Sequence, residues 1–149
     1  MKKIIALFIV SLSILGAIAF AESFYTLNGA RTSYDLDIAS GDTMLFIWTS
    51  RCPYCLSELR EMNKNENICK YSKCFFVNVG ETESAVKNVI RSLKIKEPIA
   101  NNIIMDKSAS LAGKFSIVGV PTFILMRDGK VLDRSYHFDE STVKRVFKK

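Results

Sequence analysis

The sequence predicts an α/β fold that has one mixed central β-sheet flanked by helices, with an N-terminal β-hairpin extension. Two apolar runs that are too short for helices, residues 43–49 and 74–80, are each followed by a segment with apolar residues at helical spacing. This alternation predicts a parallel βαβ unit. Asp128 and Gly129 then join two further strand-like runs, which predicts an antiparallel hairpin. A parallel half followed by a hairpin gives a mixed sheet, and 149 residues suit one domain.

The N-terminal residues predict a secretory signal peptide. Two lysines precede an uncharged apolar run, and two alanines in an A-x-A pattern end at Ala21. We therefore assign residues 1–21 to the signal peptide and residues 22–149 to one folded domain. The apolar run nearly reaches the ~18 residues of a membrane span, so an uncleaved anchor is the alternative. We expect an exported protein in the periplasm or another extracytoplasmic compartment, attached to the inner membrane only if the segment is not cleaved.

The other segments are assigned in chain order. Residues 24–36 contain an Asn-Gly pair between two short apolar-bearing stretches, which predicts the N-terminal hairpin. Leu56, Leu59 and Met62 recur at helical spacing after the first buried strand. The remaining expected elements are a helix with inner face Ala85, Val86, Val89, Ile90 and Leu93, a short strand or loop at Ile103 and Ile104, a short helix at 108–117, the hairpin at 121–136, and a helix from about Ser141 to Lys148.

Charge and histidine content argue against two classes of function. The formal net charge is +6, but the basic residues are dispersed and do not interleave with aromatic residues. We therefore expect no nucleic-acid partner. His137, the only histidine, follows the last predicted strand and belongs to no motif. We interpret it as a surface residue, which argues against a Cys–His hydrolase mechanism.

The cysteine pair in CPYC follows a predicted buried strand and precedes a predicted helix. This is the carboxyl end of the sheet, where α/β proteins place their functional sites. Cys52 falls at the helix N-cap, and Pro53 suits the first helical position, where a missing N–H costs nothing. Unpaired N–H groups and the helix dipole at that point favour a thiolate, which predicts that Cys52 is the nucleophile. Cys55 lies one turn further along the helix and is the predicted resolving thiol.

Two other cysteines, Cys69 and Cys74, lie between the first helix and the second buried strand. Four intervening residues permit a local disulfide, and export to an oxidising compartment favours one. Two free buried thiols are the alternative. The four cysteines also form a C-x2-C-x13-C-x4-C pattern close to zinc-ribbon spacing. The long buried strand before Cys52 and the lack of glycine-rich knuckles argue against zinc.

Two further motifs accompany WTSRCPYC at 48–55: FVNVGE at 76–81 and GVPTF at 119–123. Together they resemble the thioredoxin superfamily, specifically exported thiol-disulfide oxidoreductases of the TlpA/ResA type. The resemblance covers nearly all of residues 22–149. It implies a thioredoxin fold and an enzyme of the protein-disulfide reductase type that works without a bound cofactor or metal.

The resemblance also implies roles for residues outside the cysteine pair. In this family the proline matching Pro121 is cis and lies beside the redox cysteines, and the residue matching Val120 offers its backbone to an extended substrate segment. A glutamate matching Glu58 is buried near the cysteines and handles their protons. A solvated helix glutamate is the alternative for Glu58, since it lies on a predicted surface helix.

Three positions depart from the family pattern. A proline common two residues after the glutamate is Arg60 here, and a tryptophan common before the first cysteine is Arg51. The buried aspartate of thioredoxin is replaced by Phe46, which leaves Glu58 as the only expected proton carrier near the cysteines. Arg51 is interpreted as an exposed loop residue, with stabilisation of the Cys52 thiolate as the alternative.

Trp48, shortly before the cysteine pair, and Tyr54, within it, are candidate substrate-binding residues. For Trp48, packing in the core is an equally good interpretation. The predicted function is exchange of the CPYC dithiol or disulfide with cysteines of exported proteins. We expect a monomeric reductant supplied with electrons by a membrane protein, in cytochrome c maturation or general disulfide handling. The alternative is a redox-inert interaction module or a structural zinc-binding module that uses all four cysteines.

Overall fold

A seven-stranded mixed β-sheet forms the centre of the computed structural model, which describes residues 22–148; the predicted signal segment at 1–21 lies outside these residues. The strands follow the order β2-β1-β5-β4-β3-β6-β7 across the sheet. They are β1 (Ser23–Thr26), β2 (Arg31–Ser33), β3 (Asp42–Trp48), β4 (Lys73–Val79), β5 (Ile103–Asp106), β6 (Thr122–Arg127) and β7 (Lys130–Ser135). The three central strands β3, β4 and β5 are parallel and the others antiparallel, so the predicted mixed sheet is confirmed.

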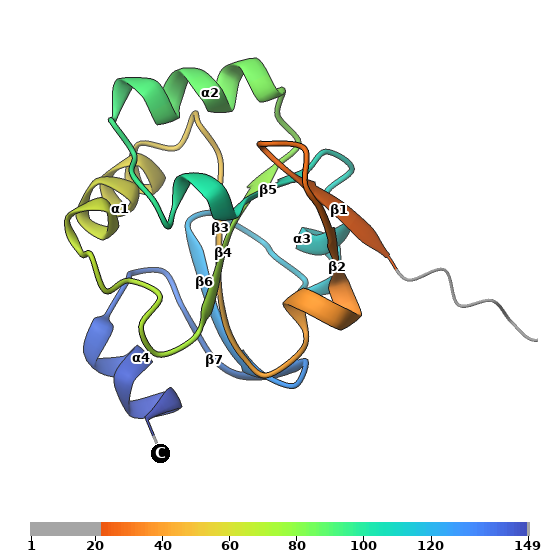
Figure 1. Cartoon of the computed structure of the whole chain (residues 1–149), viewed down its shortest axis with the longest axis vertical. Helices are drawn as coiled ribbons and strands as arrows, with labels where there is room; N and C mark the ends of the chain where they lie inside the picture. Colours follow the sequence, from red (N-terminus) through yellow and green to blue (C-terminus); the bar gives the residue numbers. More distant parts are fainter. Residues whose placement is uncertain (1–21, 149) are drawn as a thin grey trace, which may run out of the picture.

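Helices cover both faces of this sheet. They are α1 (Pro53–Lys64), α2 (Glu83–Ser92), α3 (Ser110–Lys114) and α4 (Glu140–Phe147), with a π-helical turn η1 (Tyr34–Ile38) and a 3-10 turn η2 (Ala100–Asn102). Figure 1 shows α1 and α4 on one face, and α3 with the orange η1 turn on the other. Each face has its own apolar cluster, which contains Leu59, Val86 and Val143 on the first and Ile38 and Leu111 on the second. Within residues 22–148, no helix is both long enough and apolar enough to span a bilayer.

Strand β3 is buried on both faces, as its continuous apolar sequence predicts. Met44, Phe46 and Trp48 belong to the cluster under α1, while the intervening Leu45 and Ile47 belong to the cluster under α3. The ring of Phe46 stacks on that of Phe123 in β6, with centroids 4.6 Å apart. The position that holds an aspartate in thioredoxin is therefore filled by apolar packing in this protein.

The two predicted hairpins are confirmed, and one of them contributes to the sheet in a way that the sequence did not indicate. Strands β1 and β2 pair with each other, and β1 also pairs antiparallel with β5, so the N-terminal hairpin extends the main sheet. In the β6–β7 hairpin, Asp128 and Gly129 have φ angles of 48° and 75°. Two positive φ values are the requirement of the tight turn that an Asp-Gly pair favours.

Helix α3 is shorter than the predicted range of 108–117. Ala109 and Ser116 both have left-handed backbone conformations, with φ of 57° and 51°, and they limit the helix at its two ends. The segment at Ile103 and Ile104, expected to be a strand or a loop, is the buried strand β5. The turns η1 and η2 were not predicted.

Candidate active site

The CPYC motif lies at the junction of β3 and α1. Cys52 is the N-cap of α1, with Pro53 in the first turn, and the Cys52 sulfur accepts a hydrogen bond from the Cys55 backbone N–H at 3.2 Å. No acidic residue lies in this first turn, so no carboxylate there opposes a negative charge on the sulfur. Cys52 is half-buried and Cys55 fully buried, and both are free thiols. The arrangement gives one accessible and one protected sulfur.

The two thiols influence each other strongly. Burial, as the largest cause, together with a hydrogen bond to Cys52 raises the pKa of Cys55 to about 12. A backbone hydrogen bond from Thr49 acts in the opposite direction on this pKa but is the weaker effect. Cys55 is therefore a protonated thiol at neutral pH, and it must lose its proton before it can attack.

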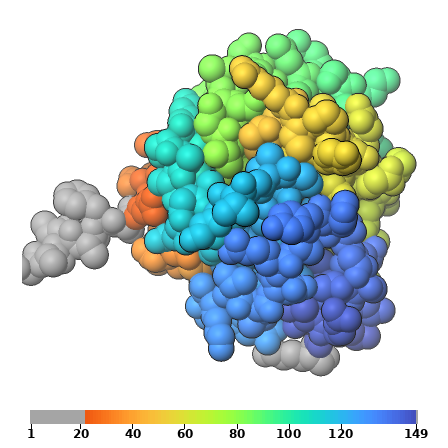
Figure 2. Space-filling view, turned by 180° about the vertical axis from the view of Figure 1, so that it is seen from behind, coloured from red at the N-terminus to blue at the C-terminus, as the bar shows by residue number. Residues whose placement is uncertain are grey.

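The loop before β6 adjoins the cysteine pair. The Val120–Pro121 peptide bond is cis, in agreement with the expectation from the resemblance. The Cys52 thiol lies 3.6 Å from the Val120 carbonyl oxygen, which accepts its hydrogen bond. Figure 2 shows the same proximity at the surface, where the yellow of the α1 region lies next to the light blue of the segment around residue 120. Two segments nearly 70 residues apart in sequence therefore form one site.

Glu58 is largely buried, with 16% of its side chain exposed, but its partners differ from those expected. One carboxylate oxygen accepts a hydrogen bond from the Phe138 backbone N–H at 3.1 Å, and the other lies 3.0 Å from His137 Nδ1. The solvated alternative for Glu58 is thus contradicted. Burial and Cys52 raise the Cys55 pKa, and Glu58 is not among the causes of this shift. His137 is exposed, as predicted, but its contact with Glu58 was missed.

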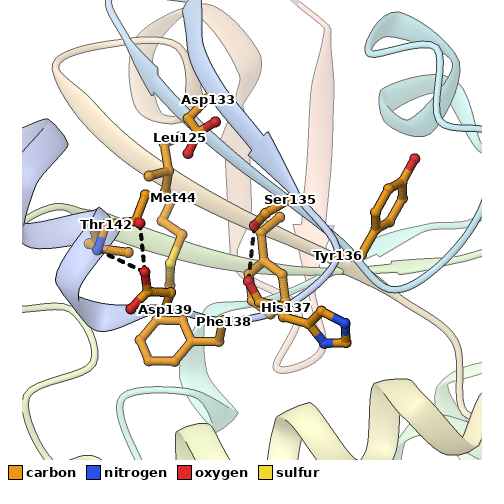
Figure 3. Close-up of a pocket in the computed structure, with 11 residues that line it drawn as sticks. Met44, Leu125, Asp133, Ser135, Tyr136, His137, Phe138, Asp139 and Thr142 are labelled. Carbon is orange, nitrogen blue, oxygen red and sulfur yellow. Dashed lines mark hydrogen bonds between the residues drawn. The ribbon is translucent and has the colours of Figure 1, made fainter.

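A pocket of about 440 Å³ lies beside the β7–α4 connection, the segment whose His137 and Phe138 contact Glu58 of α1. Met44 and Leu125 contribute apolar surface from the sheet, and Phe138 contributes it from the connection. Figure 3 shows the polar contacts at its edge, where Asp139 accepts hydrogen bonds from Thr142 at the start of α4. Asp139 is the N-cap of α4, so this carboxylate is occupied by the helix terminus.

The structure distinguishes among the other predicted site residues. Trp48 has no exposed surface, so its assignment to substrate binding is corrected in favour of core packing. Tyr54 is 74% exposed beside Cys52, where an incoming partner can reach it. Val120 is half-buried. Arg51 is exposed, as its interpretation as a loop residue required.

A carboxylate that the sequence analysis did not single out contacts the loop that carries the cysteines. Glu81, two residues after β4, accepts hydrogen bonds from the backbone N–H and the hydroxyl of Ser50, both at 2.6 Å. Asn78 donates a third hydrogen bond to it at 2.7 Å. Partial burial raises the Glu81 pKa, but the hydrogen bonds and the charge of Arg51 outweigh burial, and the pKa is lowered. Its position just after a buried parallel strand could have indicated this site from the sequence. The carboxyl ends of neighbouring parallel strands lie at the same edge of the sheet, so the residues that follow β3 and β4 come close together.

The remaining cysteines are paired, and they lie away from CPYC. Cys69 and Cys74 form a disulfide with 5.5 Å between their Cα atoms, as the local spacing predicted. They follow the end of α1, whereas Cys52 and Cys55 are at its start, and a 12-residue helix is about 18 Å long. The four cysteines therefore do not converge on one metal site.

Comparisons with known proteins agree with this architecture. A secreted Mycobacterium tuberculosis disulfide oxidoreductase homologous to Escherichia coli DsbE has 14% identity, covers 84% of this chain and 92% of its own, and has a TM-score of 0.67. StoA from Bacillus subtilis has 21% identity, with 84% and 94% covered and a TM-score of 0.64. The exposed lipoprotein thioredoxin of Streptococcus pneumoniae has 20% identity, with 84% and 98% covered and a TM-score of 0.63. At these identities the likeness establishes the fold.

Among curated proteins, no match is found. The family model described as Redoxin matches residues 18–148, which is most of the chain. The predicted relationship to thioredoxin-fold thiol-disulfide oxidoreductases is thereby confirmed, and this chain belongs to the Redoxin family.

Proposed function

We propose that this protein exchanges the Cys52–Cys55 dithiol or disulfide with cysteines of exported proteins. The observation that carries the proposal is the asymmetry of the pair: Cys52 is a partly exposed helix N-cap, while Cys55 is buried and hydrogen-bonded to it. A reactive cysteine requires access and a favourable electrostatic setting, and the helix terminus supplies both.

The exchange takes place in two steps when the protein acts as a reductant. The Cys52 thiolate attacks one sulfur of a substrate disulfide, so a mixed disulfide forms and the other substrate sulfur leaves as a thiolate. Cys55 then loses its proton and attacks the Cys52 sulfur, which breaks the mixed disulfide and releases the second substrate thiolate. Two electrons pass to the substrate, and the protein is left with a Cys52–Cys55 disulfide.

Residues around Cys52 are proposed to position the substrate. The Val120 backbone beside the cis Pro121 is available to an extended segment, which it can bind by strand-like hydrogen bonds. Tyr54, between the two cysteines, offers an exposed aromatic ring. Glu58 is proposed to accept the proton of Cys55, although its hydrogen bonds to Phe138 and His137 give it a second, structural role.

The direction of electron flow is proposed to be reduction of the substrate. Strong oxidants of this fold stabilise their reduced form through a thiolate. The raised Cys55 pKa excludes this stabilisation only at the second thiol, and the resemblance to TlpA/ResA-type proteins supports the reducing direction. Steady turnover then requires an electron donor, which we propose to be a membrane protein, and cytochrome c maturation or general disulfide handling would supply the substrates. We also propose that residues 1–21 direct export, that the protein is extracytoplasmic or anchored to the membrane, and that it is monomeric.

Trapping experiments test the proposal. Cys55→Ser should accumulate mixed disulfides with exported proteins, because the resolving thiol is missing. Cys52→Ser is the matched control and should trap none. If neither variant traps a partner and the native protein fails to reduce a protein disulfide, the alternative of a redox-inert interaction module is correct.

A further inference from the structure

One carboxylate fastens the turn in front of the redox cysteines to the neighbouring strand. Glu81 lies at the end of β4 and receives three hydrogen bonds of 2.6–2.7 Å, two of them from Ser50. Hydrogen bonds to a charged acceptor are short and about twice as strong as neutral ones. The third donor, Asn78, is fully buried in β4 and faces Trp48 across the parallel pair, so this side of the clamp is rigid. We call the set Glu81, Ser50 and Asn78 the turn clamp.

The turn clamp reaches both cysteines through the backbone of one residue. Thr49 directly precedes Ser50, and its carbonyl oxygen accepts a hydrogen bond from the Cys52 backbone N–H at 3.4 Å. A backbone hydrogen bond from Thr49 also lowers the pKa of the Cys55 thiol. The position of Ser50 therefore fixes the approach of the chain into the helix N-cap. No side chain of the clamp needs to touch a sulfur for this effect.

We propose that Glu81 is a positioning residue that sets the equilibrium between the dithiol and disulfide forms of Cys52 and Cys55 by holding the Thr49–Ser50 turn. This proposal rests on the proposed function of the pair. A disulfide within one chain forms in proportion to the effective concentration of its two thiols, which depends on how firmly they are held in place. A loosened turn lowers that concentration, so the disulfide becomes less favoured.

Three substitutions can separate the effect of the turn's position from the effect of the negative charge. In Glu81→Gln the amide oxygen can accept from Ser50 N–H and Asn78, while the amide N–H₂ can donate to the Ser50 hydroxyl, which then acts as acceptor. The clamp is preserved without its negative charge. Glu81→Ala removes both the charge and all three hydrogen bonds. Ser50→Ala removes only the hydroxyl contact and keeps the backbone one.

The test is the equilibrium of each full-length variant with mixtures of reduced and oxidised glutathione. The Cys52–Cys55 disulfide is quantified by alkylation and peptide mass spectrometry, which distinguishes it from Cys69–Cys74. We expect Glu81→Ala to lower the equilibrium constant for disulfide formation by about three-fold or more, because part of the free energy of three charge-assisted hydrogen bonds is lost. Ser50→Ala should lower it in the same direction by less, and Glu81→Gln should stay within about two-fold of the native protein.

Glu83→Ala is the matched control, since Glu83 lies two positions after Glu81, at the start of α2, but forms its ion pairs with Lys87 and Lys107. Glu83→Ala should leave the equilibrium constant for disulfide formation unchanged. At most it should lower thermal stability, which is the effect expected of a purely structural change. An unchanged constant in Glu81→Ala overturns the proposal, and so does a Glu81→Gln shift as large as the alanine shift, which would indicate charge instead. If Glu81→Ala does not fold, an unchanged constant in Ser50→Ala overturns it. Failure of the native protein to form the disulfide at any glutathione ratio would instead reject the proposed function.

Discussion

Replacing Glu58 tests whether this residue is a structural link, a proton carrier or both. Its carboxylate joins α1 to the β7–α4 connection through the Phe138 backbone N–H, and its side chain is only 16% exposed. Removing a charged acceptor from a partly buried donor costs about 1.5–3 kcal/mol, so Glu58→Ala should lower the free energy of unfolding by that amount. Glu58→Gln keeps an oxygen for Phe138 and should cost less than about 1 kcal/mol. His137→Ala should cost at most about 0.5 kcal/mol, because that side chain is 81% exposed.

Urea denaturation of the reduced protein measures these free energies. An unchanged slope of the unfolding free energy against urea concentration would show that the variants unfold in the same transition. Glu61→Ala is the matched control on the same helix, since Glu61 forms only an exposed ion pair with Lys64. The structural reasoning is refuted if Glu58→Ala lies within about 0.5 kcal/mol of the native protein or if His137→Ala is as costly.

The same Glu58→Gln variant tests proton transfer. If the carboxylate accepts the Cys55 proton, resolution of a preformed mixed disulfide at neutral pH should slow by roughly ten-fold or more. The Cys55 pKa itself should stay high, because burial and Cys52 raise it. A resolution rate equal to that of the native protein would leave Glu58 with the structural role alone.

Three other predictions concern the cysteines. Because the Cys55 pKa of about 12 lies above its unfolded value near 9.0, the reduced protein should lose stability as the pH rises above about 9. Cys55→Ser should lose less stability over the same range, and equal pH dependences in urea denaturation would contradict this. Cys52 should be alkylated faster than Cys55 in the reduced protein, and the reverse order would exchange their roles. Replacing Cys69 and Cys74 together with serine should cost roughly 2–4 kcal/mol of stability but preserve turnover in the folded variant, while stoichiometric zinc in the native protein would contradict the disulfide.

Local patterns in the sequence were sufficient for most of the architecture. The continuous apolar run of β3, the helical spacing of Leu59 and Met62, and the Asp128-Gly129 turn each report an interaction between residues close in the chain. The same is true of CPYC, because a helix N-cap is defined by its immediate neighbours. Fold class, hairpins and the start of α1 could therefore be predicted before any tertiary contact was known.

Contacts between distant segments were decided only by the tertiary structure. Three such contacts join residues that are 31 to 80 positions apart: the pairing of β1 with β5, the contact of Glu58 with His137, and the hydrogen bonds between Glu81 and Ser50. Each depends on which chain segments the packed sheet brings together, and polar side chains carry no periodic signal of their partner. Trp48 shows the same limit: an aromatic residue at a strand end suits either core or surface, and only the helix packed over it determined that it is buried.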